Sequence, residues 1–286
     1  MLQDILAAAH AFYEARLKTG STKFWYRGHR RADWTLVSTL HRYFDRLTAG
    51  LARPLSPDQR RELLREESKS LYRQFQLEAW PLLAPIERSD WGILLTMQHY
   101  GLPTRLLDWT ESFACALFFA QQHREPGDVA TVWMLDSERL NEISLGERGV
   151  LVLDENVVLT PSVHDLRPWH PKFVPPKEDI PTIAATPLFT NPRMTAQRSV
   201  FTLSGDTFIP LEQQFDGRLL QEGALVRIDL PPERFDEVAD YLRLNGLRAY
   251  TYFPDLNGLA QDHAARVEEM LRNIRRYLPQ LLGSRG

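Results

Sequence analysis

Hydrophobic residues recur at intervals of three and four in several long stretches of the chain, which is the spacing of an amphipathic helix. Ser56 followed by Pro57 is a usual helix start, and Gly20, Gly101 and Gly246 stand where three of the stretches stop. The predicted helices span residues 3–18, 56–80, 90–101, 111–124, 231–246 and 259–278. The fourth is apolar on nearly all sides, which indicates a helix inside the fold.

Shorter runs alternate or are rich in β-branched and aromatic residues, as strands are. We expect strands within residues 23–28, 102–110, 128–136, 198–205, 224–230 and 248–253. Strands and helices are interleaved irregularly. The sequence therefore predicts an α+β fold, with a mixed or antiparallel central sheet packed with several helices. We expect a single domain over residues 1–286.

A proline-rich segment interrupts this pattern. Eight of the 19 prolines fall between Pro161 and Pro192, where regular structure is not expected. The segment keeps large apolar residues such as Trp169 and Phe173, which a free linker would lack. We therefore expect an ordered excursion, over about residues 155–195, packed on the domain.

Composition excludes several classes of protein. The formal net charge of −3 gives no overall basic field for nucleic acid, although a local basic patch remains compatible with it. No apolar stretch approaches the ~20 residues that span a bilayer, so we expect no membrane association and a cytoplasmic location. A single cysteine, Cys115, and histidines without ligand spacing predict neither disulfides nor a metal site.

The stretch FWYRGH, residues 24–29, places Arg27 among aromatic residues. An arginine keeps its charge, so it needs a partner wherever a strand enters a core. Gly28 would let a ligand approach the backbone while Arg27 offers its planar fork to phosphate or carboxylate. The other interpretation is that Arg27 pairs with an internal carboxylate and is structural.

A second polar stretch, MQHYGLPTRLLDWTE, gathers His99, Thr104, Arg105 and Asp108 within ten residues. Asp108 is the candidate partner of Arg27, and His99 is a candidate base, helix cap or core residue. Further along, Gln197 precedes a strand and is interpreted either as a ligand contact or as bonded to backbone. Asp255 is expected to cap the final helix.

These stretches resemble the FRG domain family, which is named for its Phe/Tyr-Arg-Gly motif. The most specific block is QHYGLPTRLLDWT followed by the helix ACALFFA. The later stretches AQRSVFTLSG and FPDLNGLA resemble the C-terminal blocks of the family. Ser199 and Val200 stand where family members often have a glycine before the phenylalanine. This family is found in bacteria and phages.

A weaker resemblance is to ADP-ribosyltransferases, whose first strand ends in Tyr-Arg-Gly with an arginine that grips the phosphate of NAD. The order FWYRG, TRLLDWT, ACALFFA and VATVWML is similar. Gln197 occupies the position where such enzymes usually have a glutamate, so the carboxylate role would pass to Asp108 or Asp255. The resemblance implies an ADP-ribosyltransferase-like core and a toxin or anti-phage effector that uses NAD.

The resemblance also implies roles for individual residues. The candidate catalytic residues are Arg27, His99, Asp108 and Gln197. The candidate NAD-binding residues are Tyr26, Arg27, Gly28, His29, Tyr100, Thr104 and Arg105. The acceptor of ADP-ribose would be a protein or a nucleic acid. The alternative is a non-catalytic module of the same fold that senses a nucleotide or nucleic acid.

Overall fold

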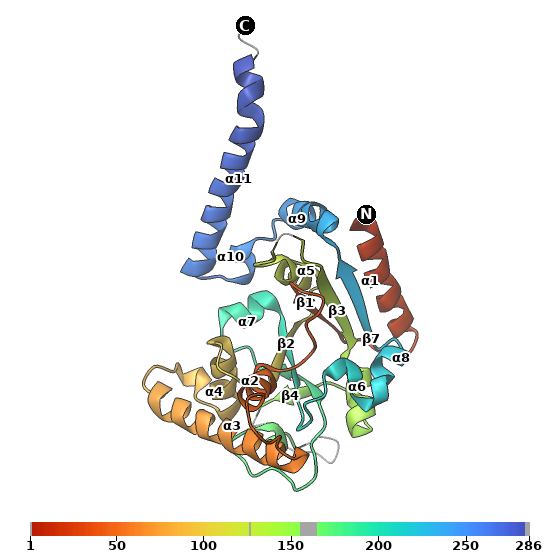
Figure 1. The fold of residues 1–286 in the computed structure, drawn as a ribbon, viewed down its shortest axis with the longest axis vertical. Helices are drawn as coiled ribbons and strands as arrows, with labels where there is room; N and C mark the ends of the chain where they lie inside the picture. The colour runs from red at the N-terminus through yellow and green to blue at the C-terminus, as the bar shows by residue number, and fades with distance from the viewer. Residues whose placement is uncertain (1, 126, 155–164, 284–286) are drawn as a thin grey trace.

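The computed structural model describes residues 2–125, 127–154 and 165–283. A seven-stranded sheet in the order β4-β5-β6-β2-β1-β3-β7 runs through the molecule (Figure 1). Neighbouring strands are antiparallel except for the parallel pair β4 and β5. The strands are β1 (Phe24–His29), β2 (Leu106–Thr110), β3 (Ala130–Asp136), β4 (Leu151–Leu153), β5 (Ile183–Pro187), β6 (Ser199–Leu203) and β7 (Leu225–Leu230).

Helices pack on both faces of this sheet, which confirms the predicted α+β fold. They are α1 (Leu2–Leu17), α2 (Thr39–Thr48), α3 (Pro57–Ala79), α4 (Asp90–His99), α5 (Phe113–Gln121), α6 (Ser137–Leu145), α7 (Pro192–Gln197), α8 (Arg218–Gln221), α9 (Phe235–Leu244), α10 (Ala249–Tyr252) and α11 (Leu256–Gly283). Figure 1 shows most of α11 projecting away from the body of the molecule. Among the described helices, none combines the length and the apolar character that crossing a membrane requires.

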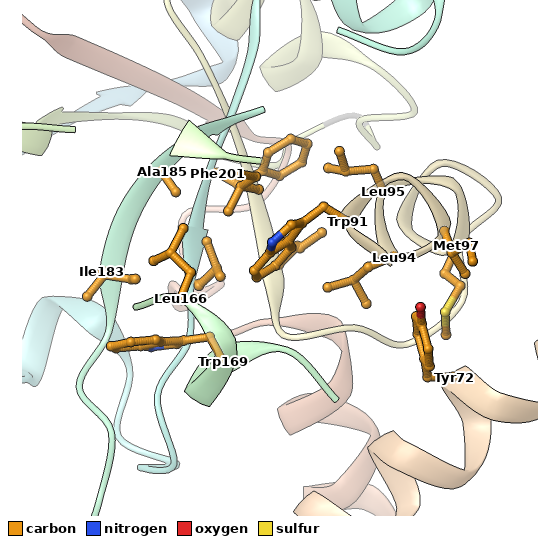
Figure 2. Close-up of a cluster of buried hydrophobic side chains, with 14 of the residues drawn as sticks. Tyr72, Trp91, Leu94, Leu95, Met97, Leu166, Trp169, Ile183, Ala185 and Phe201 are labelled. Atoms are coloured by element: carbon orange, nitrogen blue, oxygen red, sulfur yellow. The ribbon is translucent and has the colours of Figure 1, made fainter. Parts of the chain in front are cut away.

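Helix α4 is held against the sheet by a large apolar cluster (Figure 2). Its residues Trp91 and Leu95 are buried with Phe201 of β6 and Ile183 of β5. Burying such side chains contributes about 2–3 kcal/mol each in transfer free energy. This packing fixes the last turn of α4, which ends in the sequence Met-Gln-His.

Helix α5 covers the same face of the sheet as α4, at β1. Its small residues Ala116 and Ala120 are fully buried and allow the helix backbone to approach the strand closely. A Cβ built on Gly28 would lie 2.0 Å from the carbonyl oxygen of Ala116 and 2.5 Å from the amide nitrogen of Ala120. Gly28 is therefore required by the helix that packs on it. The glycine and the alanine-rich helix form one packing unit.

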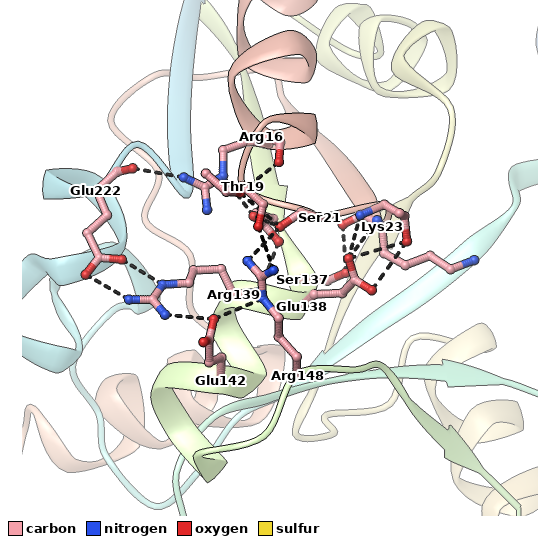
Figure 3. Close-up of polar contacts among 12 residues, drawn as sticks. Arg16, Thr19, Ser21, Lys23, Ser137, Glu138, Arg139, Glu142, Arg148 and Glu222 are labelled. Carbon is pink, nitrogen blue, oxygen red and sulfur yellow. Dashed lines mark hydrogen bonds and ion pairs between the residues drawn. The ribbon is translucent and has the colours of Figure 1, made fainter.

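The far end of β3 is anchored by a buried ionic cluster (Figure 3). Arg16 of α1 donates from Nε to Asp136 Oδ2 at 2.8 Å, and Ser21 also donates to that oxygen. The backbone amide of Arg139 donates to the other carboxylate oxygen at 2.9 Å. Because one buried carboxylate accepts hydrogen bonds from all three residues, this cluster joins α1 to the start of α6.

The structure corrects two expectations. Residues 248–253 do not form a strand, because Ala249–Tyr252 is a short helix in which Tyr252 is buried and Tyr250 is exposed. Residues two apart share a face in a strand but lie about 200° apart around a helix, so a buried Tyr252 and an exposed Tyr250 fit the helix. Helices α6, α7 and α8 and strand β4 are among the additions to the predicted elements.

The expectation for the proline-rich segment was partly wrong. Regular structure is present there, because Ile183–Pro187 forms the interior strand β5. Trp169, Ile180 and Ile183 of this segment are buried in the cluster under α4. Residues 155–164 of the predicted excursion lie outside the described residues.

Candidate functional site

A cavity of about 520 Å³ opens where β1 and β2 diverge. Their register joins them at one pair, Tyr26 with Thr110, whereas β1 pairs with β3 over six positions and β2 with β6 over five. Past that pair, Arg27 of β1 and Asp108 of β2 both line the space between the strands. The remaining walls come mainly from the last turn of α4 and from α7. The site thus lies on the helix-covered face of the sheet, at the point where these two strands separate.

Arg27 is held by protein contacts on two of its three guanidinium nitrogens. Its Nε donates to His29 Nε2 at 2.8 Å, and its Nη1 donates to the backbone carbonyl of Asp108. Nη1 also lies 3.9 Å from Asp108 Oδ2, and the Arg27 side chain is 18% exposed. Nη2 makes no hydrogen bond within the part of the chain that the structure describes. A fixed guanidinium with a remaining donor edge is suited to an anionic ligand.

Burial determines the protonation states of Arg27 and His29. It lowers the pKa of Arg27 to about 10, which still leaves the guanidinium charged at neutral pH. Burial and the charge of Arg27 together lower the pKa of His29 to about 3. The His29 imidazole is therefore neutral and carries its proton on Nδ1, since Nε2 accepts from Arg27. His29 acts as a support for Arg27.

Asp108 is oriented by a chain of hydrogen bonds from the block that begins at Gln98. Gln98 Nε2 donates to Asp108 Oδ2 at 2.7 Å, and Gln98 Oε1 accepts from the hydroxyl of Thr104. That hydroxyl in turn accepts from the backbone amide of Leu106 at 3.0 Å. The amide of Gln98 cannot flip without breaking this chain. One carboxylate oxygen is thereby fixed, and the side chain stays 56% exposed toward solvent.

Arg27 and the block from Gln98 to Asp108 lie within one segment that matches a family model. Residues 22–128 match the model of the FRG domain. The chain carries an FRG domain. No curated protein and no solved structure matches the chain significantly. The predicted FRG resemblance is confirmed, and the FRG segment spans β1, α2 to α5 and β2.

The FRG segment does not supply all the residues that line the cavity. Gln197, the last residue of α7, lies beyond it and also lines the cavity. Its Nε2 donates to the carbonyl of Tyr252 at 3.0 Å, and its own backbone carbonyl accepts from Thr110 at 2.6 Å. The Gln197 side chain is therefore hydrogen-bonded to backbone, which is one of the two interpretations of the sequence. Its location beside the cavity is compatible with the other interpretation, a contact with a ligand.

The structure brings six of the predicted site residues into the cavity wall. They are Tyr26, Arg27, Gly28, His99, Asp108 and Gln197. His99 is half-buried, and burial followed by the nearby charge of Arg193 lowers its pKa. A neutral imidazole at the end of α4 is available as a hydrogen-bond partner or a base.

Three of the predicted NAD-binding residues support this wall from outside the lining. His29 and Thr104 are buried behind Arg27 and Gln98, respectively. Tyr100 is 71% exposed, with its ring edge-on to His99 at 4.9 Å between centroids.

Arg105 points to a different part of the fold. Its Nη1 lies 3.0 Å from Asp206 Oδ1 and donates to the carbonyl of Gly205 at 2.9 Å. Arg65 of α3 binds the same carboxylate. Burial raises the pKa of Asp206, but hydrogen bonds and charges from these arginines outweigh it, and the net pKa is lowered. Arg105 thus ties β2 to the loop after β6.

Several cavity residues escaped the sequence reasoning. Arg30 lies with its guanidinium 4.9 Å from the ring centroid of Trp34, and both line the cavity. Arg193 enters from α7. Arg30 and Trp34 stand in the basic, aromatic stretch RGHRRADW, which could have identified them. Arg193 has no comparable sequence signal.

The cavity wall contains more positively than negatively charged side chains. Its lining includes three arginines, Arg27, Arg30 and Arg193, and the single carboxylate of Asp108. Aromatic rings of Tyr26, Trp34 and others provide apolar surface beside these charges. Within the described residues, no group of three or more histidine, cysteine, aspartate or glutamate side chains could hold a metal. The wall suits a planar, anionic ligand.

Proposed function

We propose that the cavity binds NAD and that the chain transfers its ADP-ribose group to a protein or nucleic-acid acceptor. The observation that carries this proposal is the geometry of Arg27. Its Nε and Nη1 are held by His29 and Asp108, while Nη2 has no partner among the described residues. A phosphate of NAD would receive that remaining donor edge. The 520 Å³ volume falls within the usual range of small-molecule sites.

The chemistry needs a group that stabilises positive charge on the ribose. When the bond between ribose C1′ and the nicotinamide nitrogen breaks, the electron pair leaves with nicotinamide and the ribose becomes oxocarbenium-like. The acceptor nucleophile then bonds to C1′ and loses its proton. Asp108 is the carboxylate in the cavity lining, and Gln98 fixes one of its oxygens. A preoriented carboxylate beside the ribose would favour that state.

A second candidate is a non-catalytic nucleotide-binding module. It is favoured by Gln197, which the resemblance aligns with the usual glutamate of ADP-ribosyltransferases and whose amide donates to the carbonyl of Tyr252. The positively charged wall would serve a sensor as well as an enzyme. The two candidates share the ligand and differ in whether nicotinamide is released.

One experiment separates them. The purified chain is incubated with NAD, binding is measured by calorimetry and nicotinamide release by chromatography, with Arg27→Ala and Gln197→Ala alongside. Binding with release that both substitutions reduce supports the transferase. Binding without release supports the sensor module. Absence of both binding and release would overturn the proposal.

A further inference from the structure

The two most deeply buried arginines among the described residues, Arg16 and Arg105, are each paired with a carboxylate. Arg16 donates to Asp136 at 2.8 Å, and Arg105 lies 3.0 Å from Asp206. These pairs offset the cost of removing a guanidinium from water. Arg193 differs, because it is half-buried in the cavity wall and forms no hydrogen bond or ion pair with any residue in the described ranges.

Arg193 is nevertheless held in place by its surroundings. Its guanidinium lies over the ring of Phe253, 4.5 Å from the centroid, so one flat side is covered. Cation–π stacking leaves the N–H edges of the group available to another partner. Phe253 belongs to the turn between α10 and α11, and the preceding Tyr252 holds Gln197 through its carbonyl. This turn therefore positions two residues of α7 at the cavity.

Arg193 and Arg27 reach the cavity from different elements, α7 and β1. Burial lowers the pKa of both guanidinium groups, and the charge of Asp108 opposes that lowering in each, joined at Arg193 by the charge of Asp255. Both arginines are therefore within the electrostatic reach of Asp108. One exposed carboxylate thus faces two arginines that each keep unused donors. The charge of the site remains positive without a ligand.

We propose that Arg193 is a second anion-binding residue of this cavity and that, together with Arg27, it binds the two phosphates of a nucleoside diphosphate group. This inference rests on the proposed function, and it names the diphosphate as the part of the ligand that is recognised. Arg27 takes one phosphate with its Nη2 edge, and Arg193 takes the other with the N–H edges that Phe253 leaves open. A monophosphate engages one arginine at a time.

The test compares ADP and AMP as probes, with binding to the full chain measured by calorimetry. The wild type should bind ADP more tightly than AMP, by about 10-fold or more, because the second phosphate adds charge-assisted hydrogen bonds. Arg193→Ala should weaken ADP binding by about 10- to 100-fold and change AMP binding by less than about 3-fold. Arg193→Lys keeps the charge but loses the fork, so ADP binding should be intermediate.

Arg124→Ala is the matched control. Arg124 also stacks on a phenylalanine, Phe235, at 4.9 Å, and it is absent from the cavity lining. Its removal should leave ADP and AMP binding unchanged. Thermal unfolding of each variant confirms that it is folded during the titration.

The possible failures are distinct. If the wild type binds NAD and Arg193→Ala binds ADP as the wild type does, the inference about Arg193 is overturned and the proposed function stands. If the wild type discriminates ADP from AMP and Arg193→Ala retains that discrimination, the inference is likewise wrong. If the folded wild type binds neither NAD nor ADP, both the inference and the proposed function fail.

Discussion

Arg27 and Asp108 face one another where two neighbouring strands of one sheet separate, with Nη1 of the arginine 3.9 Å from Oδ2 of the aspartate. Nη1 of Arg27 donates its hydrogen bond to the backbone carbonyl of Asp108, so the carboxylate of Asp108 is not the acceptor of that bond. If the guanidinium and the carboxylate had used all their hydrogen-bonding atoms on each other, both residues would have been purely structural. The observed arrangement leaves Nη2 of Arg27 and one oxygen of Asp108 for a ligand.

The first prediction concerns Arg27 itself. Arg27→Lys should weaken NAD binding by at least about 10-fold, because one ammonium group cannot reproduce the fork that holds His29, Asp108 and a phosphate together. Calorimetry with NAD measures the loss. Arg31→Ala is the control, since Arg31 is exposed and pairs with Asp33 at 2.7 Å. Unchanged NAD affinity in folded Arg27→Lys would show that Arg27 is purely structural.

The second prediction concerns the hydrogen-bond chain to Asp108. Thr104→Val removes the hydroxyl that fixes the amide of Gln98 while preserving shape. We expect kcat for nicotinamide release to fall by about 10-fold through misorientation of Asp108, with KM for NAD within about 2-fold. Thr96→Val is the control, because Thr96 is buried in α4, the helix of Gln98, but donates to the carbonyl of Gly92 at 2.8 Å. An equal fall in both variants would indicate a general packing effect.

The third prediction tests the role assigned to Gly28. Gly28→Ala should destabilise the fold by about 3 kcal/mol, because the added methyl group collides with the backbone of α5. Urea denaturation measures the change in the free energy of unfolding. Gly50→Ala is the control, since a Cβ at Gly50 meets nothing within 4 Å, and its effect should stay within about 0.5 kcal/mol. Near-wild-type stability of Gly28→Ala would contradict the close approach.

The fourth prediction is a pH dependence of stability carried by three buried histidines. Burial, as the largest cause, lowers the pKa of His29 and His41 to about 3 and that of His170 to about 4. Each is neutral in the folded state and would bind a proton near pH 6.5 when unfolded. The stability they contribute is complete above pH 6.5 and is lost as the pH falls toward 4.

Urea denaturation at pH 7.5, 6.0, 5.0 and 4.5 measures this effect. Each histidine can contribute a slope of up to about 1.4 kcal/mol per pH unit within that window. His263→Gln, at an exposed position, should leave the profile unchanged. A free energy of unfolding that stays constant from pH 7.5 to 4.5 would show that these histidines are protonated in the fold.

Local sequence signals were sufficient to predict many of the helices and strands. Ser56 and Pro57 start α3 as predicted, with Ser56 accepting from the amide of Gln59, and Asp255 caps α11 by accepting from Gly258 at 2.8 Å. Capping depends on residues within one turn, so it can be read from sequence. The error at residues 248–253 arose where a run of six residues fits either period.

The site was predictable only in part. The block from Gln98 to Asp108 could be identified as polar groups on a short stretch, and most of its contacts are local. The partner of Arg105 lies a hundred residues away at Asp206, and nothing local distinguishes Arg105 from a ligand-binding arginine. Arg193 reaches the cavity through a helix placed by Phe253, which is a tertiary relationship without a sequence pattern.

The strand order has a practical consequence for anyone who would express the matched segment alone. Residues 22–128 include two of the seven strands, and each loses the partner on its outer side: β6 beside β2 and β3 beside β1. A fragment with those bounds would present two unpaired backbone edges, a recognised cause of aggregation. The boundaries of sequence similarity and those of an expressible unit therefore differ in this protein.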